Sequence, residues 1–328
     1  MGGDPGVSDD PVRRETAAGA TAAFEAHRRL LFGVAYDMLG SVADAEDCVQ
    51  ETWIRWARAD RSNIREPRGY LVRVVANVAL DRLRDARARR ESYVGPWLPE
   101  PLLTAPDAAE RVERAEAVSY ALLVVLETLG PVERAVFVLR EVFGLPYAEI
   151  AEILGRSAAG VRQVAHRARE HVRARRPRFS ADPAGQRRLT ERFLAACRDG
   201  DVAGLTELLA EDVVVVTDGG GRARAALRPV AGLDRAVRFL AGLGAMYAGA
   251  RAEVASLNGG PGLVLYPGGA PAVSGVPLAA AVVEAAGGRI TRVLVVRNPD
   301  KLHMLRHVPS GTAPVPRDAP GGSTTPLT

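Results

Sequence analysis

Basic and amide side chains recur at helical spacing between residues 156 and 178, a stretch with eight arginines and one glutamate. The polar face of this predicted helix carries Arg162, Gln163, His166, Arg167 and Arg169. Arginine neutralises phosphates and forms paired hydrogen bonds with base edges, so this combination is typical of duplex DNA recognition. The alternative is a helical hairpin whose basic face is simply solvated.

The residues before this face predict the element that positions it. Apolar side chains share one face of residues 147–154, Gly155 can end that helix with a positive φ, and Ser157 can cap the next helix. Two short helices joined by such a turn form a helix-turn-helix, whose second helix enters the major groove with its early residues. Ser157 therefore joins the candidate DNA-binding residues.

A second basic surface is predicted on the long amphipathic helix over residues 70–90. Arg73, Asn77, Asp81 and Arg84 line one of its faces at spacings of three or four residues. Residues 68–90 hold seven arginines and two aspartates. Because Asn and Arg pair with base edges and arginine planes stack on unpaired bases, these four residues are candidate contacts to DNA. A solvated face is again the alternative.

An acidic face lies on the helix predicted between residues 41 and 58. Asp44, Asp47, Gln50 and Glu51 form this face beside an apolar stripe that includes both tryptophans of the segment. A face of this sign excludes DNA and suits docking onto a basic partner helix. Solvation without a partner is the alternative here too.

Length and composition restrict the class of protein. At 328 residues, with 47% hydrophobic and 25% charged residues, the chain is expected to be globular with two or three domains. Cys48 and Cys197 lack metal-ligand spacing, so neither a disulfide framework nor a zinc site is predicted. Without a signal pattern or an apolar run of about 20 residues, a cytoplasmic protein with no membrane contact is expected.

Proline, glycine and polar runs divide the chain. The predicted segments are a disordered leader (1–20), a first helical module (21–91), a proline-rich linker (92–108), a second helical module (109–178), an α+β domain (184–308) and a disordered tail (309–328). Besides the helices already described, helices are predicted over 24–39, 109–129 and 132–143. An exposed Trp97 in the linker is expected to dock on another surface.

The second half consists of predicted helices followed by predicted strands. The helices are expected over 186–197, 202–209 and 233–243, and the strands over 213–217, 251–257, 262–265, 279–284 and 290–296. The glycine turn over 218–222 is expected to lead into a return strand over 223–227. Helices followed by a curved antiparallel sheet indicate an α+β domain.

Several of these segments, in this order, resemble bacterial sigma factors of the sigma-70 family, of the extracytoplasmic-function type. The resemblance rests on residues 44–53, 70–84, 129–137 and 147–172, and it covers about residues 23–178. It implies that Asp47, Gln50 and Glu51 dock on core RNA polymerase. It also implies that the candidate residues of the long helix lie near the promoter −10 element, and those of the helix-turn-helix near the −35 element.

The second half resembles the SnoaL-like, ketosteroid-isomerase-like cone, and sigma factors with this extension form a recognisable subgroup. The signatures are residues 97–101, 218–222 and 298–302. The resemblance implies that the extension regulates the sigma modules in cis, in place of a separate anti-sigma factor. The implied interdomain residues are Trp97, Leu98, Pro99, Asp218, Gly219, Gly220, Gly221, Arg222, Asn298, Pro299, Asp300 and Lys301.

Cone folds also house enzymes, so a small-molecule isomerase or hydrolase tethered to a DNA-binding module is the alternative hypothesis. Asp218 lies in a glycine turn, Glu284 ends a predicted strand, and His303 and His307 follow the last strand. They form no evident acid–base pair, so no catalytic residue, metal or cofactor is predicted. A ligand in the cone and a conventional repressor that works without polymerase are left open.

Overall fold

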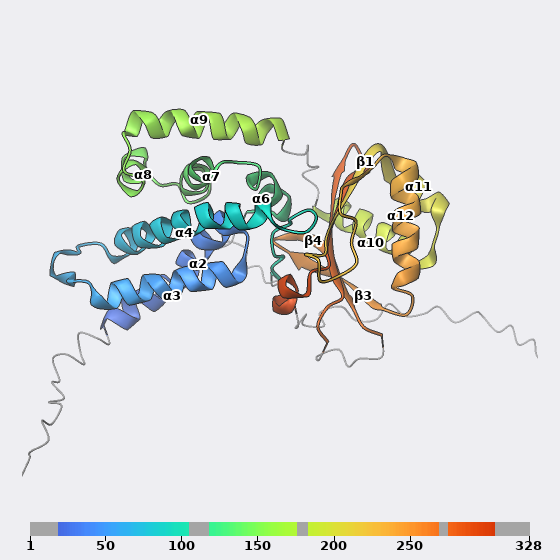
Figure 1. Cartoon of the computed structure of the whole chain (residues 1–328), viewed down its shortest axis with the longest axis horizontal. Helices are drawn as coiled ribbons and strands as arrows, with labels where there is room; N and C mark the ends of the chain where they lie inside the picture. Colours follow the sequence, from blue (N-terminus) through green and yellow to red (C-terminus); the bar gives the residue numbers. More distant parts are fainter. Residues whose placement is uncertain (1–18, 105–117, 176–182, 269–274, 306–328) are drawn as a thin grey trace, which may run out of the picture.

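The computed structural model describes residues 19–104, 118–175, 183–268 and 275–305. Helices make up the first half, and a sheet with three helices makes up the second (Figure 1). Most of the predicted leader, the predicted tail and His307 lie outside these residues. None of the helices described is long and apolar enough to span a membrane.

The first helical module, residues 19–91, is built from local signals that the sequence carries. Its principal helices are α2 (Arg28–Leu39), α3 (Val42–Arg58) and α4 (Pro67–Glu91), with the short η1 (Arg61–Asn63) between the last two. Gly40 ends α2 with a φ of 67°, and the Ser41 hydroxyl caps α3 by accepting from the Asp44 N–H. Pro67 occupies the first turn of α4, where a missing N–H does no harm.

Two predictions at the start of this module are wrong. Residues 19–25 are already helical, so the leader does not extend to residue 20. The helix predicted over 24–39 is interrupted at residues 26–27, before α2 begins. The early helix is held in place because the Trp56 indole N–H donates to the carbonyl oxygen of Ala20 at 2.9 Å.

The second helical module, residues 118–175, contains the predicted helix-turn-helix. Its elements are α6 (Tyr120–Leu126), α7 (Pro131–Phe137), the π-helical η2 (Val138–Val142), α8 (Tyr147–Leu154) and α9 (Ala158–Arg175). The helix predicted over 109–129 is wrong in its described part, because Val118 and Ser119 are not helical and Ser119 caps a short α6. Residues 109–117 lie outside the described part of the chain.

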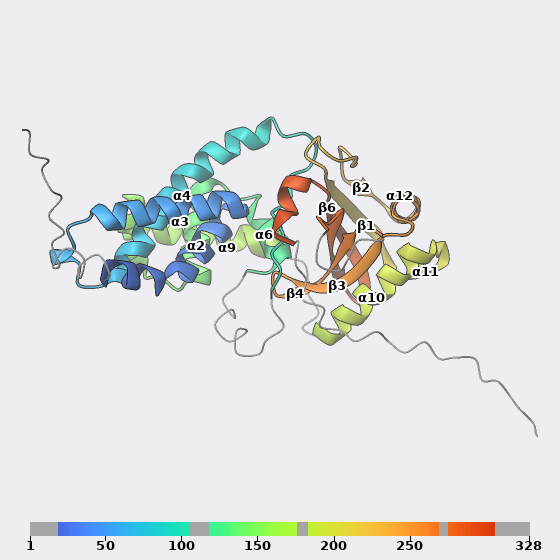
Figure 2. The same cartoon turned by 90° about the horizontal axis from the view of Figure 1, so that it is seen from below.

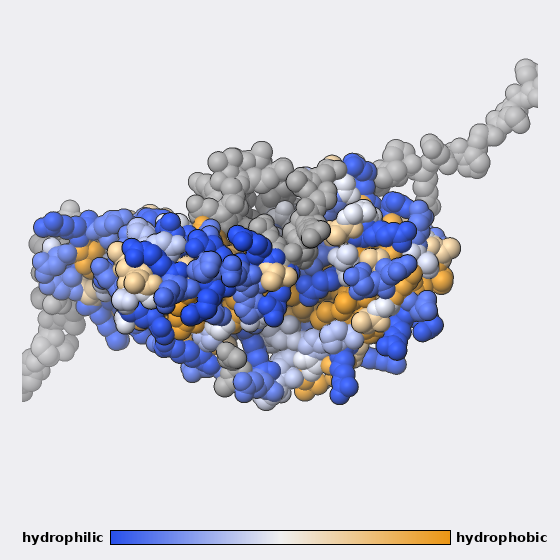
Figure 3. Space-filling model, turned by 90° about the horizontal axis from the view of Figure 1, so that it is seen from above, coloured by the Kyte–Doolittle hydropathy of each residue, from blue (hydrophilic) through white to orange (hydrophobic). Residues whose placement is uncertain are grey.

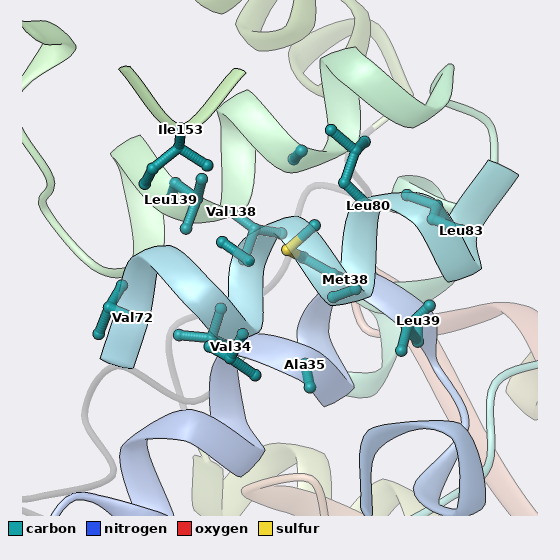
Figure 4. Packing of buried hydrophobic residues seen from close by; sticks show 14 of the residues in the cluster. Val34, Ala35, Met38, Leu39, Val72, Leu80, Leu83, Val138, Leu139 and Ile153 are labelled. Carbon is teal, nitrogen blue, oxygen red and sulfur yellow. The ribbon is translucent and has the colours of Figure 1, made fainter. Parts of the chain in front are cut away.

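The two helical modules share one hydrophobic core. Val34 and Met38 of α2 and Val72 of α4 belong to the same cluster as Val138 and Leu139 of η2 (Figure 4). These side chains are almost fully buried. Since apolar area withdrawn from water contributes roughly 25 cal/mol per Å², this shared core holds the modules side by side.

The C-terminal domain, residues 183–305, has the predicted α+β architecture. Its elements are α10 (Pro183–Asp199), α11 (Val202–Leu208), β1 (Leu209–Asp218), β2 (Val230–Ala231), α12 (Leu233–Met246), β3 (Arg251–Leu257), β4 (Gly260–Tyr266), β5 (Ala279–Ala286), β6 (Arg289–Val296), η3 (Pro299–Lys301) and η4 (His303–Leu305). Residues 223–227 form no strand, so that prediction is wrong. The return strand is β2, which pairs with Val214 and Val215.

The sheet order is β2-β1-β6-β5-β4-β3, and one pair corrects the antiparallel prediction. β1 and β6 are parallel, with Asp218 opposite Val296, whereas the other pairs are antiparallel. Parallel neighbours finish at the same edge of a sheet. The turn after Asp218 and the turn that begins at Asn298 therefore lie together.

Both faces of the sheet are covered, which explains why β5 and β6 read as nearly continuous apolar runs. Ala281 and Val283 pack under the three helices, whereas Ala280 and Val282 face the opposite side. That opposite side packs against α6 and against residues 92–104, which we call the strap. Figure 2 shows the strap running between the end of α4 and the sheet.

Candidate functional site

The helix-turn-helix has the geometry that its sequence predicts. Gly155 has a φ of 60° after α8, and the Gly160 N–H donates to the Ser157 hydroxyl at 3.1 Å. The predicted inward residues Val161, Val164, Ala165 and Ala168 are buried. Figure 3 shows the side of the molecule that α9 occupies, and hydrophilic residues predominate there over the helical half.

Among the residues that the structure describes, the polar face of α9 makes exposed or loose contacts with carboxylates. Arg167 lies 3.8 Å from Glu133, Arg169 lies 3.4 Å from Glu141, and His166 lies 3.9 Å from Glu170. The Arg162 guanidinium lies 5.8 Å from the centre of the Tyr147 ring, and Gln163 is exposed. Exposed pairs contribute little, about 0–1 kcal/mol each, so phosphates can replace these carboxylates at small cost.

The candidate face of α4 contacts the second helical module. Arg73 forms an ion pair of 2.6 Å with Glu152, which belongs to the first helix of the helix-turn-helix. Asn77 donates to the Arg73 carbonyl, and Asp81 pairs with Arg84 at 2.9 Å. The structure thus brings part of one candidate DNA-binding face against the element that carries the other.

The acidic face of α3 is solvent-exposed at its centre. Asp47 accepts from Arg82 of α4 at 2.9 Å, and Glu51 accepts from Arg55 at 2.5 Å. Gln50 is exposed and lines a pocket of about 220 Å³. Asp44 is half-buried in the first turn, where a carboxylate suits the helix dipole.

The three signature segments of the strap and C-terminal domain meet at one buried ion pair. Lys301 donates from Nζ to Asp218 Oδ2 at 2.7 Å and to the Leu98 carbonyl oxygen at 2.6 Å. The Leu98 N–H donates to the same Asp218 oxygen at 2.9 Å. We call this group the Asp218–Lys301 clasp, because it fixes both polar backbone groups of one strap residue.

Trp97 is half-buried against this clasp, so the expectation that it docks on another surface is confirmed. The Lys301 ammonium lies 3.0 Å from the centre of the indole ring, and the Arg90 guanidinium lies 4.6 Å away. Tyr93 packs edge-on against the ring at 4.9 Å. Cation–π contacts strengthen when desolvated, so Trp97 and Lys301 stabilise each other's burial.

The glycine turn after β1, residues 219–221, allows Tyr93 of the strap and Asn298 to approach its backbone closely. Gly220 has a φ of 56°, and a Cβ there would collide with the Asn298 side chain and the Tyr93 hydroxyl. That hydroxyl donates to Asp218 Oδ1 at 2.6 Å and accepts from Asn298 Nδ2 at 2.9 Å. Arg222 pairs with Asp300 at 3.1 Å on the exposed rim. Close approach explains the glycines, and Pro299 starts the short η3.

Burial perturbs the titration of the clasp. It lowers the pKa of Lys301 to about 8, although the Asp218 carboxylate opposes this shift. Burial, followed by the hydrogen bond to Asp218, raises the pKa of Tyr93. The Asp218 carboxylate thus offsets part of the penalty that burial places on the charged Lys301 ammonium.

A group of residues around the end of α2 was not predicted from the sequence. The carbonyl oxygen of Asp37 accepts from Arg134, that of Leu39 accepts from Arg90, and that of Gly40 accepts from the Glu100 N–H. Glu127 pairs with both arginines, and Tyr36 bonds to Glu100 and Asn258. No local pattern identifies such residues, because each partner lies on a different segment.

Of the four side chains considered for catalysis, Asp218 is paired with Lys301, which was not one of them, and the strap covers this ion pair. Glu284 lies inside β5 rather than at its end, where it is buried beside Arg292 at 3.3 Å, and burial raises its pKa. His303 is partly exposed and bonds to the Asp300 carbonyl.

These features define a class: two helical modules, one with a helix-turn-helix, whose connecting strap is clasped by an α+β domain. Residues 23–89 match the family described as sigma-70 region 2, and residues 119–172 match that described as sigma-70, region 4.

The chain is 42% identical to the ECF RNA polymerase sigma factor SigJ of Mycobacterium tuberculosis, over 85% of this chain and 91% of the relative. It is also 42% identical to the probable ECF RNA polymerase sigma factor SigI of that species, over 58% and 66%. The crystal structure of SigJ superposes with a TM-score of 0.69 and 38% identity, over 86% of this chain and 97% of that one.

The chain therefore belongs to the extracytoplasmic-function RNA polymerase sigma factors, which direct promoter-specific transcription initiation. This confirms the predicted family, and the match to the SigJ structure extends over both the helical half and the C-terminal domain.

Proposed function

We propose that the C-terminal domain regulates this sigma factor in cis, by holding the two helical modules together until the Asp218–Lys301 clasp opens. The observation that carries the proposal is the clasp itself, which binds the N–H and the carbonyl oxygen of Leu98 in the strap. A covalently attached regulator acts at a high effective concentration, so no separate anti-sigma factor is required. The protein acts in the cytoplasm.

The closed arrangement supports this proposal through the placement of the two modules, which the exposed Arg73 pair marks but does not hold. Arg73 is paired with Glu152, so the first helix of the helix-turn-helix lies beside the candidate −10 face of α4. The shared apolar core fixes the two modules in this position. Two modules packed together cannot lie at the same time on two separated promoter elements.

The roles of the exposed faces follow from charge and geometry. Asp47, Gln50 and Glu51, with Asp44 beside them, dock on core RNA polymerase. The candidate residues of α4 contact the −10 element, and those of α9 with Ser157 contact the −35 element. Counterion release at the arginines makes promoter binding strongly dependent on salt.

The C-terminal domain has no catalytic role in this proposal. Asp218 is engaged by Leu98, Tyr93 and Lys301, so its carboxylate is not free to abstract a proton from a substrate. Apolar side chains such as Phe193, Leu205 and Val293 pack between the helices and the sheet.

The test is transcription in vitro with core RNA polymerase, on a promoter recovered by selecting genomic fragments that the holoenzyme binds. Lys301→Met leaves Asp218 buried without its cation and should open the clasp. We expect several-fold more transcript than with the unaltered chain. The matched control is Arg187→Ala, which removes an exposed pair on α10 away from the clasp and should change the yield little.

Two outcomes would contradict the proposal. Equal transcript yields from Lys301→Met and the unaltered chain would show that the clasp does not restrain activity. If the triple variant Asp47→Ala, Gln50→Ala and Glu51→Ala initiates normally, the acidic face of α3 is not the polymerase contact.

A further inference from the structure

The tip of the hairpin between β3 and β4 reaches out of the C-terminal domain into the first helical module. Its turn consists of Asn258 and Gly259, with φ values of 47° and 78°. Asn followed by Gly is typical of tight hairpin turns, so the positive φ alone needs no further explanation. The unusual feature is burial, because Asn258 is only 5% exposed although it sits at the tip of a hairpin.

The oxygen and the nitrogen of the Asn258 side-chain amide form hydrogen bonds with two different segments, the strap and α2. Its Oδ1 accepts from the Leu102 N–H of the strap at 3.0 Å, and its Nδ2 donates to the Tyr36 hydroxyl of α2 at 2.8 Å. The Asn258 N–H also donates to the Leu102 carbonyl at 2.9 Å. The Tyr36 hydroxyl in turn donates to the Glu100 carbonyl at 2.5 Å. The two partners fix which end of the amide carries the oxygen.

Tyr36 lies at the start of the last turn of α2, and this turn also binds a residue of the second helical module. Carbonyl groups at a helix end have no partner within the helix. Here the Asp37 carbonyl accepts from Nε and Nη2 of Arg134, both at 3.3 Å, and Arg134 is only 1% exposed. Glu127 fixes that guanidinium with an ion pair of 2.6 Å. Asn258 and Arg134 thus bind adjacent residues of α2 from two different domains.

We propose that Asn258 is a positioning residue that couples the C-terminal domain to the second helical module through the end of α2. This inference deepens the proposed regulation in cis, but it concerns a contact separate from the Asp218–Lys301 clasp. While the hairpin holds Tyr36, the Asp37 carbonyl stays where Arg134 can reach it. When the hairpin withdraws, the Tyr36 and Leu102 groups lose buried partners, and the end of α2 is free to shift.

Coupling of this kind is reciprocal. If the hairpin stabilises the contact between Arg134 and α2, then that contact stabilises the seating of the hairpin by the same factor. A small shift of the end of α2 is costly, because the buried Arg134 guanidinium, paired with Glu127, tolerates little displacement from its acceptors. Polymerase or DNA that separates the helical modules would therefore also loosen the C-terminal domain.

The test compares hydrogen exchange of the full chain with that of two variants. Asn258→Gly keeps the turn, since glycine adopts positive φ readily, and removes only the amide. Tyr36→Phe keeps the ring and removes only the hydroxyl. In both variants we expect at least three-fold faster exchange in residues 36–42 and in residues 131–139 of the second helical module. Glu207→Ala, on an exposed side chain of α11, is the control and should match the unaltered chain.

Faster exchange confined to residues 98–104 and the hairpin, with residues 131–139 unchanged, would overturn the coupling. If Asn258→Gly increases exchange throughout the C-terminal domain, the result with Tyr36→Phe determines whether the coupling exists, because Tyr36 lies outside that domain.

The two proposals can be rejected independently of each other. If Lys301→Met raises transcription while hydrogen exchange of residues 131–139 is unchanged in Asn258→Gly and Tyr36→Phe, only the coupling is wrong. The reverse pattern would leave the coupling standing and reject restraint by the clasp.

Discussion

The two interfaces around the first helical module differ in chemistry. Its contact with the second helical module is mainly apolar, with Met38 and Val138 in one cluster beside the single buried guanidinium of Arg134, whereas the Asn258 amide joins it to the C-terminal domain. Apolar contact is non-directional and tolerates sliding. Buried ion pairs and hydrogen bonds of a side-chain amide require one geometry, and they are lost together when that geometry is lost. We therefore expect the polar interface to open in an all-or-none manner, and the apolar interface to persist through small movements.

The largest expected effect comes from breaking the clasp. Asp218→Ala should destabilise the closed strap by about 3–5 kcal/mol, because Lys301 stays buried without a counter-charge. The measurement is hydrogen exchange at the Leu102 amide, a strap amide that donates to Asn258 and not to Asp218. The double variant Asp218→Leu with Lys301→Met should recover much of the loss, since no unpaired charge is left. A double variant as unstable as the single one would show that the charges do not dominate.

An apolar deletion should behave differently. Leu139→Ala, at a fully buried position of η2, should destabilise the helical half by about 3 kcal/mol through lost contacts and a residual cavity. Thermal unfolding measures this loss, with Val202→Ala at an exposed position of α11 as the control. We expect the strap to stay clasped, so the exchange of the Leu98 amide should change little. A loosened strap in this variant would refute the separation of the two interfaces.

The smallest effect concerns Asp37 beside Arg134. Burial raises the pKa of Asp37 to about 8, although Arg134 opposes the shift. Since this pKa is higher in the folded chain, its contribution to stability is complete below about pH 4 and is lost as pH rises through 8. Asp37→Asn should remove that decline and raise Tm by a few degrees at pH 8. Parallel pH profiles of Tm for the two proteins would contradict this.

Local signals predicted most of the helical half. Gly155 and Ser157 define the turn of the helix-turn-helix because a positive φ and a capping hydroxyl are properties of single residues. The helix over 109–129 failed where Ser119 caps α6 instead of continuing a helix. In the C-terminal domain, the sequence predicted the five longer strands, but it misplaced the return strand β2 and missed the parallel pairing of β1 with β6. Strand order depends on contacts across many residues, which periodicity does not encode.

The interdomain site was predicted in part. The resemblance to a sigma-factor subgroup pointed to the three signature segments, and the parallel strands bring two of them to one edge. Tyr93 and Asn258 were missed, because a tyrosine in a linker and an asparagine before a glycine have common structural uses. Their roles depend on partners 125 and 222 residues away in the chain.

The clasp also gives this molecule a built-in reporter. Lys301 carries the only side-chain amine in the sequence, and it is 3% exposed while the strap is closed. An amine-directed reagent, once reaction at the chain's α-amino group is subtracted, would therefore modify a single atom. Its rate of reaction would measure how often the Asp218–Lys301 clasp opens.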